Sequence, residues 1–324
     1  MASSMTLRVT TPAGKKPIRK LPSNIEIGAG TTVEEAKRII ARHTGMRDYH
    51  RIAIVDTTTK SIIKDRLSIL AQNPGVQATG DIAVKDLGPQ VSWRTVYVVE
   101  YAGPIFLSLL LAYPLRAYIY PTALFGPATP FSTVQTISLA LIVLHFIKRE
   151  LETVFLHRFS AATMPASYIL RNLAYYWLSM LNIAYWVFAP NAAAAAPLEE
   201  GRDTYILAAG LAVYLFGELA NFNTHVILAN LRPKGTTKRG IPKGFGFGIV
   251  ACPNYLFELV SWIGVLLVTR SFATGGFCVV AWLWMQRWAV GREKRYRKEF
   301  GAAYKPHLYP MTPGWALPIR KAKE

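Results

Sequence analysis

Cysteine and acidic residues are both scarce in this chain, and each shortage limits the classes of protein to which it can belong. Its 324 residues include only 2 Cys, which excludes a framework of disulfides. Cys252 and Cys278 fall in apolar stretches, where we expect them to pack as inert side chains. Asp and Glu number 19 against 37 Lys and Arg, giving a formal net charge of +18. Such a charge would suit a nucleic-acid partner, but the basic residues cluster at the ends of apolar blocks.

The motifs of common soluble enzymes are missing as well. The glycine-rich run at 244–248 neither follows a strand nor opens a helix, so it is not a Rossmann fingerprint. There is no P-loop and no GxSxG nucleophile elbow. The six His are scattered without the spacing of metal ligands on one helix, so we expect no resident metal. The first 90 residues are polar and mixed, so we expect no cleavable signal peptide.

Long apolar blocks indicate an integral membrane protein. Hydrophobic residues make up 52% of the chain and charged residues 17%, and the mean hydropathy is +0.22. A helix needs about 20 apolar residues to cross a bilayer. We predict six transmembrane helices, at residues 96–116, 131–147, 168–189, 204–222, 247–268 and 272–290. A re-entrant segment near residues 240–256 would make the number seven.

The distribution of basic residues predicts how these spans are oriented in the membrane. The connections at 117–132 and 190–203 contain one Arg between them, whereas 148–158, 232–243 and the tail after 290 are rich in Lys and Arg. Cytosolic loops carry the excess of basic residues. We therefore expect both termini and the two basic loops to face the cytosol.

The first 88 residues predict a separate small domain. Strands are expected at 6–10, 24–27 and 51–55 from their alternating patterns. Thr32 and Glu35 form a capping box that opens a helix between the second and third strands. This order resembles the ubiquitin-like β-grasp. We interpret it as a cytosolic docking or stabilising module, or as a small α/β domain without a partner. Because no Gly-Gly tail follows, we expect no conjugation.

The strongest functional signal is a group of polar residues inside the predicted span 247–268. Asn254, Tyr255 and Glu258 lie there, although polar and ionisable groups are costly at membrane depth. Asn254 and Glu258 are four residues apart and so share one helical face. A phenol close to a carboxylate can donate a proton to a developing oxyanion. The other interpretation is a polar contact between neighbouring helices.

Further polar residues gather at the cytosolic ends of the spans. Glu100 lies near the end of the first span, as a site residue or as an ordinary interfacial Glu. His145, Arg149 and Glu152 share one helical face, so Arg149 can pair with Glu152, although such a charged helix end can also be a simple anchor. The basic stretch 292–301 suits phosphates and an adenine ring, or an anionic membrane surface.

Residues across most of the chain resemble the very-long-chain trans-2-enoyl-CoA reductases of the endoplasmic reticulum, within the steroid 5α-reductase superfamily. The matching groups are Glu100 with Gly103-Pro104, His145 with Lys148-Arg149, Glu152-Thr153, His157-Arg158-Phe159-Ser160, Tyr175-Tyr176-Trp177, Asn221-Phe222 with His225, Leu231-Arg232-Pro233, Cys252-Pro253-Asn254-Tyr255 with Glu258, Ser261-Trp262-Ile263-Gly264, Tyr296 and Lys298-Glu299-Phe300. An N-terminal ubiquitin-like domain also belongs to this branch. The resemblance implies a ubiquitin-like domain at 1–88 and a membrane-embedded catalytic domain at 89–324.

The resemblance also implies the last reduction of fatty acid elongation. NADPH would deliver hydride to the β carbon of a long-chain trans-2-enoyl-CoA, with Tyr255 as proton donor or oxyanion partner and Glu100 orienting the reacting end. The implied cofactor-binding residues are Asn221, Arg232, Asn254, Glu258, Trp262 and Tyr296, with Arg149 and Arg158 as further phosphate contacts. The acyl chain would lie among the spans, beside membrane lipids. Other elongation enzymes are the expected partners, and nucleic acid is not.

Two features depart from the family pattern. Phe146 stands where steroid-reducing relatives have a Tyr that holds the substrate ketone, which disfavours a steroid substrate. The extreme C-terminus, Lys321 to Glu324, lacks the family ending and the spacing of a dilysine retrieval signal. Two other functions stay open at this point: a methyltransferase of the isoprenylcysteine type that uses S-adenosylmethionine, and a non-enzymatic membrane adaptor.

Overall fold

The computed structural model describes residues 4–159, 162–231 and 239–314. Contacts within the chain divide it into two compact units. The first comprises the N-terminal residues to Val96 and the segment Phe159–Leu170. The second comprises Tyr97–Arg158 and the described residues from Arg171 onward, and it is helical.

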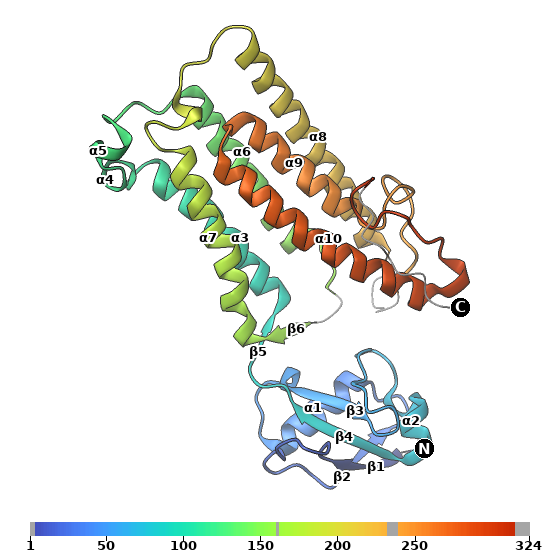
Figure 1. Cartoon of the computed structure of the whole chain (residues 1–324). Helices are drawn as coiled ribbons and strands as arrows, with labels where there is room; N and C mark the ends of the chain where they lie inside the picture. Colours follow the sequence, from blue (N-terminus) through green and yellow to red (C-terminus); the bar gives the residue numbers. More distant parts are fainter. Residues whose placement is uncertain (1–3, 160–161, 232–238, 315–324) are drawn as a thin grey trace. The chain divides into compact units, whose positions relative to one another are not determined.

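The first unit is built on a mixed four-stranded sheet (Figure 1). Its strands are β1 (Ser4–Thr10), β2 (Asn24–Gly28), β3 (Ile52–Asp56) and β4 (Asp81–Asp86), in the order β2-β1-β4-β3. β1 and β4 are parallel, and the other neighbours are antiparallel. Smaller elements are η1 (Tyr49–Arg51), η2 (Leu70–Gln72), α2 (Pro74–Thr79), and the antiparallel pair β5 (Gln90–Ser92) and β6 (Thr163–Pro165).

Helix α1 (Val33–Thr44) forms the core of this unit together with the sheet. The capping box of Thr32 and Glu35 is present, and the helix ends at Gly45, whose φ of 72° is easy only for glycine. Val33 and Ile40 on α1 are fully buried in one cluster with Ile54 of β3. The predicted strands and capping box are confirmed, while the ubiquitin-like assignment and the docking role stay predictions.

Six long helices dominate the rest of the chain: α3 (Trp93–Ala112), α6 (Thr133–Leu151), α7 (Ile169–Val187), α8 (Arg202–Asn230), α9 (Pro253–Thr269) and α10 (Phe272–Phe300). Short elements connect or follow them: α4 (Arg116–Ile119), α5 (Thr122–Phe125), the π turn η3 (Glu152–Leu156), η4 (Ala166–Tyr168), η5 (Ala193–Ala195) and η6 (Gly301–Ala303). Each long helix coincides with one predicted span.

Two of these helices, α3 and α8, are long and apolar enough to cross a membrane, and α9 is a shorter apolar helix. Membrane crossing by all six stays a prediction. The span predicted at 247–268 begins too early, because α9 starts at Pro253 with Cys252 as its N-cap. Gly244 and Gly246 have φ of 106° and 79°, which favours turns, and the described residues 239–252 contain no helix. A seventh helix is therefore not found in that stretch.

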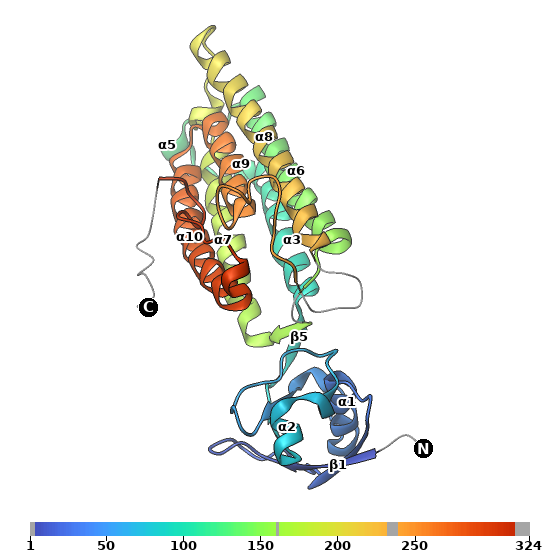
Figure 2. The same cartoon turned by 90° about the vertical axis from the view of Figure 1, so that its right-hand side faces the viewer.

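Glycines let α8 and α9 pack very closely, and Figure 2 shows the two helices side by side. A Cβ on Gly217 of α8 would lie 2.5 Å from the Ser261 backbone nitrogen of α9. A Cβ on Gly264 of α9 would lie 2.5 Å from the Tyr214 backbone nitrogen of α8. Small residues at helix contacts permit this approach of two backbones. The contact brings the polar side chains of α8 within reach of those on α9.

We expect Gly264→Ala to force α8 and α9 apart. The added methyl group meets backbone rather than a flexible side chain, so the cost should be about 1–3 kcal/mol of stability. Gly276→Ala on α10 is the matched control, because no heavy atom lies within 4 Å of the Cβ it would add. Thermal unfolding in detergent should show a lower midpoint for Gly264→Ala alone. Equal midpoints for the two variants would contradict the close packing.

Candidate active site

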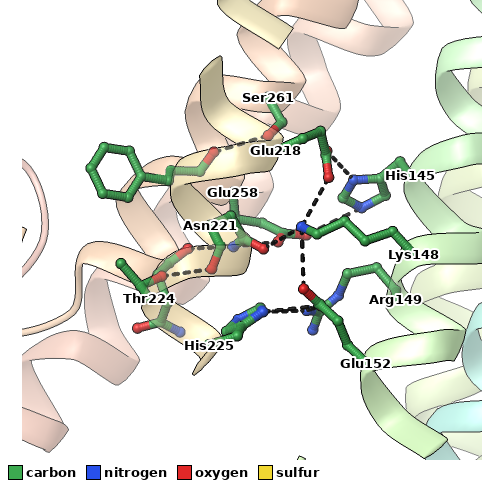
Figure 3. A network of polar contacts seen from close by, with 12 residues as sticks. His145, Lys148, Arg149, Glu152, Glu218, Asn221, Thr224, His225, Glu258 and Ser261 are labelled. Atoms are coloured by element: carbon green, nitrogen blue, oxygen red, sulfur yellow. Dashed lines mark hydrogen bonds and ion pairs between the residues drawn. The ribbon is translucent and has the colours of Figure 1, made fainter. Parts of the chain in front are cut away.

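Charged and polar side chains from α6, α8 and α9 meet in a buried network (Figure 3). On α6 and α8 they recur at spacings of three and four residues, which places them on one face of each helix. α6 and the π turn after it contribute His145, Lys148, Arg149 and Glu152; α8 contributes Glu218, Asn221 and His225; α9 contributes Glu258. We call these eight side chains the buried polar network.

The carboxylate of Glu218 contacts two basic side chains of α6, those of His145 and Lys148. One of its carboxylate oxygens lies 2.7 Å from Nδ1 of His145, and the other lies 2.9 Å from Nζ of Lys148. Nε2 of His145 lies 3.3 Å from a carboxylate oxygen of Glu258. His145 therefore bridges carboxylates on two different helices.

Asn221 ties the same three helices together through its amide. Its Oδ1 accepts a hydrogen bond from Lys148 Nζ at 2.6 Å. Its Nδ2 donates to the Asn254 carbonyl at 2.9 Å and to Glu258 Oε2 at 3.1 Å. Asn254 and Glu258 thus both lie against α8, Asn254 through its backbone carbonyl and Glu258 through its carboxylate.

Arg149 is fixed by three partners. Its Nη1 lies 2.6 Å from Glu152 Oε2 and 3.2 Å from Nδ1 of His225, and its Nη2 donates to the Tyr101 hydroxyl at 3.0 Å. The predicted pair of Arg149 and Glu152 is confirmed. Buried charges persist only when they are paired and hydrogen-bonded, and removing one member leaves its partner uncompensated.

A cavity of about 100 Å³ opens beside the network within the helical unit. Its polar wall includes Arg149, His225, Asn254, Tyr255 and Glu258. Its other lining residues are mostly aromatic: Tyr101, His145, Phe146, Tyr175, Tyr176, Trp262, Phe277, Ala281, Trp284, Met285 and Trp288. The cavity thus joins charge and hydrogen-bonding groups on one side to an apolar surface on the other.

Tyr255 sits in the first turn of α9 and lines this cavity. The guanidinium of Arg292 lies close to its hydroxyl and to that of Tyr296. A nearby cation stabilises negative charge on a phenol oxygen. The phenol is therefore suited to act as a proton donor.

The segment after α10 holds the start of α9 in place. The Cys252 N–H donates to the Pro310 carbonyl at 2.9 Å, and Nε2 of His307 lies 2.7 Å from the Phe247 carbonyl oxygen. Glu293 accepts from the His307 backbone N–H at 3.0 Å. The Glu293 carboxylate also faces the His307 side chain and raises the pKa of that imidazole. This clamp fixes the backbone from which Tyr255 projects.

The structure brings together some of the site residues expected from the sequence. Asn254, Tyr255, Glu258, Trp262 and Arg149 line the cavity, and Asn221 belongs to the network behind it. Glu100, Arg158 and Tyr296 do not line it.

Glu100 is 1% exposed on α3, and one of its carboxylate oxygens has no hydrogen-bond partner among the described residues. Tyr296 is buried and packs edge-on to Tyr304 at 5.5 Å, and Arg158 is exposed. Arg232 lies outside the described residues.

Several residues of the site were not predicted as such. Glu218 is an ionisable residue inside an apolar run, which is the signal that pointed to Glu258, and it could have been found in the same way. Tyr101 and Arg292 carry no such signal, because a tyrosine or a basic residue at a membrane helix end is ordinary. Only the packing of the helices shows that both belong to the site.

Glu152, His157 and His225 have ligand atoms within 4.8 Å of one another, as a metal site would require. The Arg149 guanidinium, however, already hydrogen-bonds to Glu152 and His225. A metal ion there would lie against a fixed positive charge, so this arrangement favours an ion-pair cluster over a metal site.

Known proteins resemble this chain over most of its length. The family model described as 3-oxo-5-alpha-steroid 4-dehydrogenase matches residues 162–314. The "Very-long-chain enoyl-CoA reductase" of Dictyostelium discoideum is 36% identical over 305 residues, covering 92% of this chain and 95% of the relative. A Trypanosoma brucei brucei protein named as a candidate enoyl-CoA reductase is 42% identical over 226 residues, covering 69% and 72% of the two chains. A Caenorhabditis elegans protein named as a candidate very-long-chain enoyl-CoA reductase is 38% identical over 226 residues, covering 67% and 70%.

Glu218→Gln should destabilise the helical unit strongly, because it leaves His145 and Lys148 with one fewer buried counter-charge. Breaking such a pair costs about 3–5 kcal/mol. Glu199→Gln is the control: its ion pair with Arg202 spans 3.8 Å with both side chains 77% exposed, and pairs of that kind contribute at most about 1 kcal/mol. Thermal unfolding in detergent compares the two variants. A midpoint for Glu218→Gln as high as that of the control would show that the network does not stabilise the fold.

Proposed function

The chain belongs to the family of very-long-chain enoyl-CoA reductases and reduces enoyl-CoA in fatty acid elongation, and we propose that the cavity beside the buried polar network is where this reduction occurs. The observation that carries the proposal is the position of Tyr255. Its side chain lines a cavity whose wall combines polar and aromatic residues, and the Arg292 guanidinium lies close to its hydroxyl.

The residues present fit a nicotinamide cofactor. Asn254 lines the cavity, and no described residue hydrogen-bonds to its side-chain amide, so that amide is available to pair with a carboxamide. Trp262 offers an aromatic surface beside it. A dinucleotide is far larger than 100 Å³, so only the reacting ends of cofactor and substrate would share this cavity. We infer NADPH as the cofactor because the basic turns of α10 can receive its phosphates, whereas Arg149 is already held by Glu152 and Tyr101.

The chemistry develops negative charge that this cavity can stabilise. A reduced nicotinamide, when bound, supplies a hydride to the β carbon of a trans-2-enoyl thioester. Charge then appears on the thioester oxygen and the α carbon. Tyr255 gives its proton to the substrate, and the adjacent Arg292 stabilises the negative charge left on the phenol oxygen.

The remaining predicted residues take supporting roles in this proposal. Asn221 and Glu258 hold the polar wall in place, and Tyr296, Arg158 and Arg232 would meet the adenine end and the phosphates. Glu100 does not line the cavity, so it would orient the reacting end indirectly, through α3.

The aromatic side of the cavity favours an acyl substrate. Trp262 packs against Phe277 with ring centroids 4.6 Å apart, and Trp284 and Trp288 continue the surface along α10. An acyl chain leaving this surface would run between the helices and beside membrane lipids, where it needs no water. We place the protein in the endoplasmic reticulum membrane with both termini cytosolic, where other elongation enzymes supply its substrate.

Tyr255→Phe should lower kcat for a long trans-2-enoyl-CoA by about 10²–10⁴-fold, because it removes a proton donor. NADPH binding should persist, since the ring and the neighbouring network remain. Tyr205→Phe, at an exposed position of α8, is the control and should keep full activity. NADPH oxidation by the purified protein measures all three forms. If Tyr255→Phe turns over as fast as the wild type, Tyr255 is only a packing residue.

The cofactor assignment has a separate test. Under the same assay, NADPH should give a higher kcat/KM than NADH, because the 2′-phosphate adds a charge that arginines can bind. Equal kcat/KM values with the two cofactors would contradict the assignment of NADPH and leave the reductase activity standing.

A further inference from the structure

We propose that the Tyr101 hydroxyl is a second donor in the active site, which hydrogen-bonds to the thioester oxygen of the substrate while Tyr255 protonates the α carbon. This inference rests on the proposed function, because it assigns a role within the same cavity. Negative charge develops on the thioester oxygen and on the α carbon, and the proposal assigns one tyrosine to each.

Tyr101 lines the cavity together with Tyr255 and is held rigidly. Its side chain on α3 is 2% exposed. The ring stacks on Tyr97 at 5.6 Å and meets Tyr176 edge-on at 5.4 Å. Phe146, which has no hydroxyl of its own, packs against the same ring at 6.2 Å. A ring packed on three sides keeps its hydroxyl in one place, as a preorganised donor requires.

The hydrogen bond from Arg149 determines which way the Tyr101 proton can go. Nη2 of Arg149 donates to the Tyr101 oxygen at 3.0 Å, and a guanidinium has no acceptor to offer in return. The phenol proton must therefore find another acceptor. Among the residues that the structure describes, none accepts a hydrogen bond from Tyr101. A buried donor left without a partner is costly, so an acceptor supplied by a ligand in the cavity would remove that cost.

Arg149 cannot turn away to release the phenol oxygen. Its other terminal nitrogen, Nη1, donates to Glu152 at 2.6 Å and lies 3.2 Å from Nδ1 of His225. Its guanidinium carbon also lies 5.1 Å from the Tyr101 ring centre. A fixed cation on the phenol oxygen draws electron density from the O–H bond, which makes Tyr101 a stronger donor. Tyr255 likewise has an arginine, Arg292, close to its hydroxyl.

The two phenols suit the two steps of the reduction. Hydride adds to the β carbon, the C=C π electrons move to form a C=C bond between the α and carbonyl carbons, and the carbonyl π electrons go to the thioester oxygen. Tyr101 stabilises that oxygen by a hydrogen bond, without losing its proton. The enolate then collapses to the thioester as the α carbon takes the proton of Tyr255, and water reprotonates the Tyr255 phenolate. The product is the saturated acyl-CoA, with the oxidised cofactor.

The experiment compares Tyr101→Phe with the wild type by infrared spectroscopy and by kinetics. A trans-2-enoyl-CoA with a ¹³C thioester carbonyl is bound without cofactor, so no reduction occurs. We expect the carbonyl band to move to higher frequency in Tyr101→Phe, because a hydrogen-bond donor is lost. The value of kcat should fall by about 10²–10³-fold, as for one oxyanion donor, with little change in KM. Tyr97→Phe is the control, because it keeps the stack on Tyr101 but removes a hydroxyl that does not line the cavity, and its band should not move.

The alternatives give different results. If the carbonyl band is unchanged in Tyr101→Phe, the proposal is wrong, whether or not kcat falls. If only the KM for the cofactor rises, the hydroxyl contacts the cofactor instead, and the proposal is also wrong. In both cases the wild type still reduces enoyl-CoA, so the proposed function survives. Failure of the wild type to consume NADPH with any trans-2-enoyl-CoA would refute the proposed function itself.

Discussion

The pairing of buried charges between α6, α8 and α9 is the constraint on which the rest of the site depends. Glu218 and Glu258 can be buried together because His145 of α6 reaches both carboxylates and Lys148 reaches Glu218. Their short contacts require a close approach of α8 to α9, which Gly217 permits. The network therefore fixes the polar wall of the cavity before any ligand binds, and a preorganised wall need not reorganise when charge develops on the substrate.

Three groups of residues hold the walls of the cavity in place. The buried polar network holds the wall from one side, aromatic rings fill the other, and the segment after α10 clamps the start of α9 through His307 and Glu293. The two arginines behind Tyr101 and Tyr255 come from different helices. A catalytic group supported in this way from a rigid helix is held more precisely than one on a loop.

Much of the fold and part of the site could be predicted from short-range patterns in the sequence. The long apolar blocks predicted the six long helices and the capping box predicted α1. The spacing of Asn254 and Glu258 predicted a shared face, and both residues line the cavity. What could not be predicted is which faces meet. His145 and Glu218 are 73 residues apart, and no local pattern places them 2.7 Å from each other. Tyr101 acquires its role only from Arg149, which reaches it from another helix. The early start predicted for the fifth span reflects apolar residues before Pro253 that form turns instead.

Photo-crosslinking would test most directly whether this cavity holds the reacting end of the substrate. A long-chain acyl-CoA with a diazirine next to the thioester is irradiated with the full-length protein, and the labelled peptides are sequenced by mass spectrometry. We expect labels on cavity-lining residues of α6, α9 and α10, such as Phe146, Trp262 and Trp288, and their loss when unlabelled trans-2-enoyl-CoA competes. Labels confined to residues 4–88, or to the short helices α4 and α5, would show that the acyl-CoA binds elsewhere and would contradict this account.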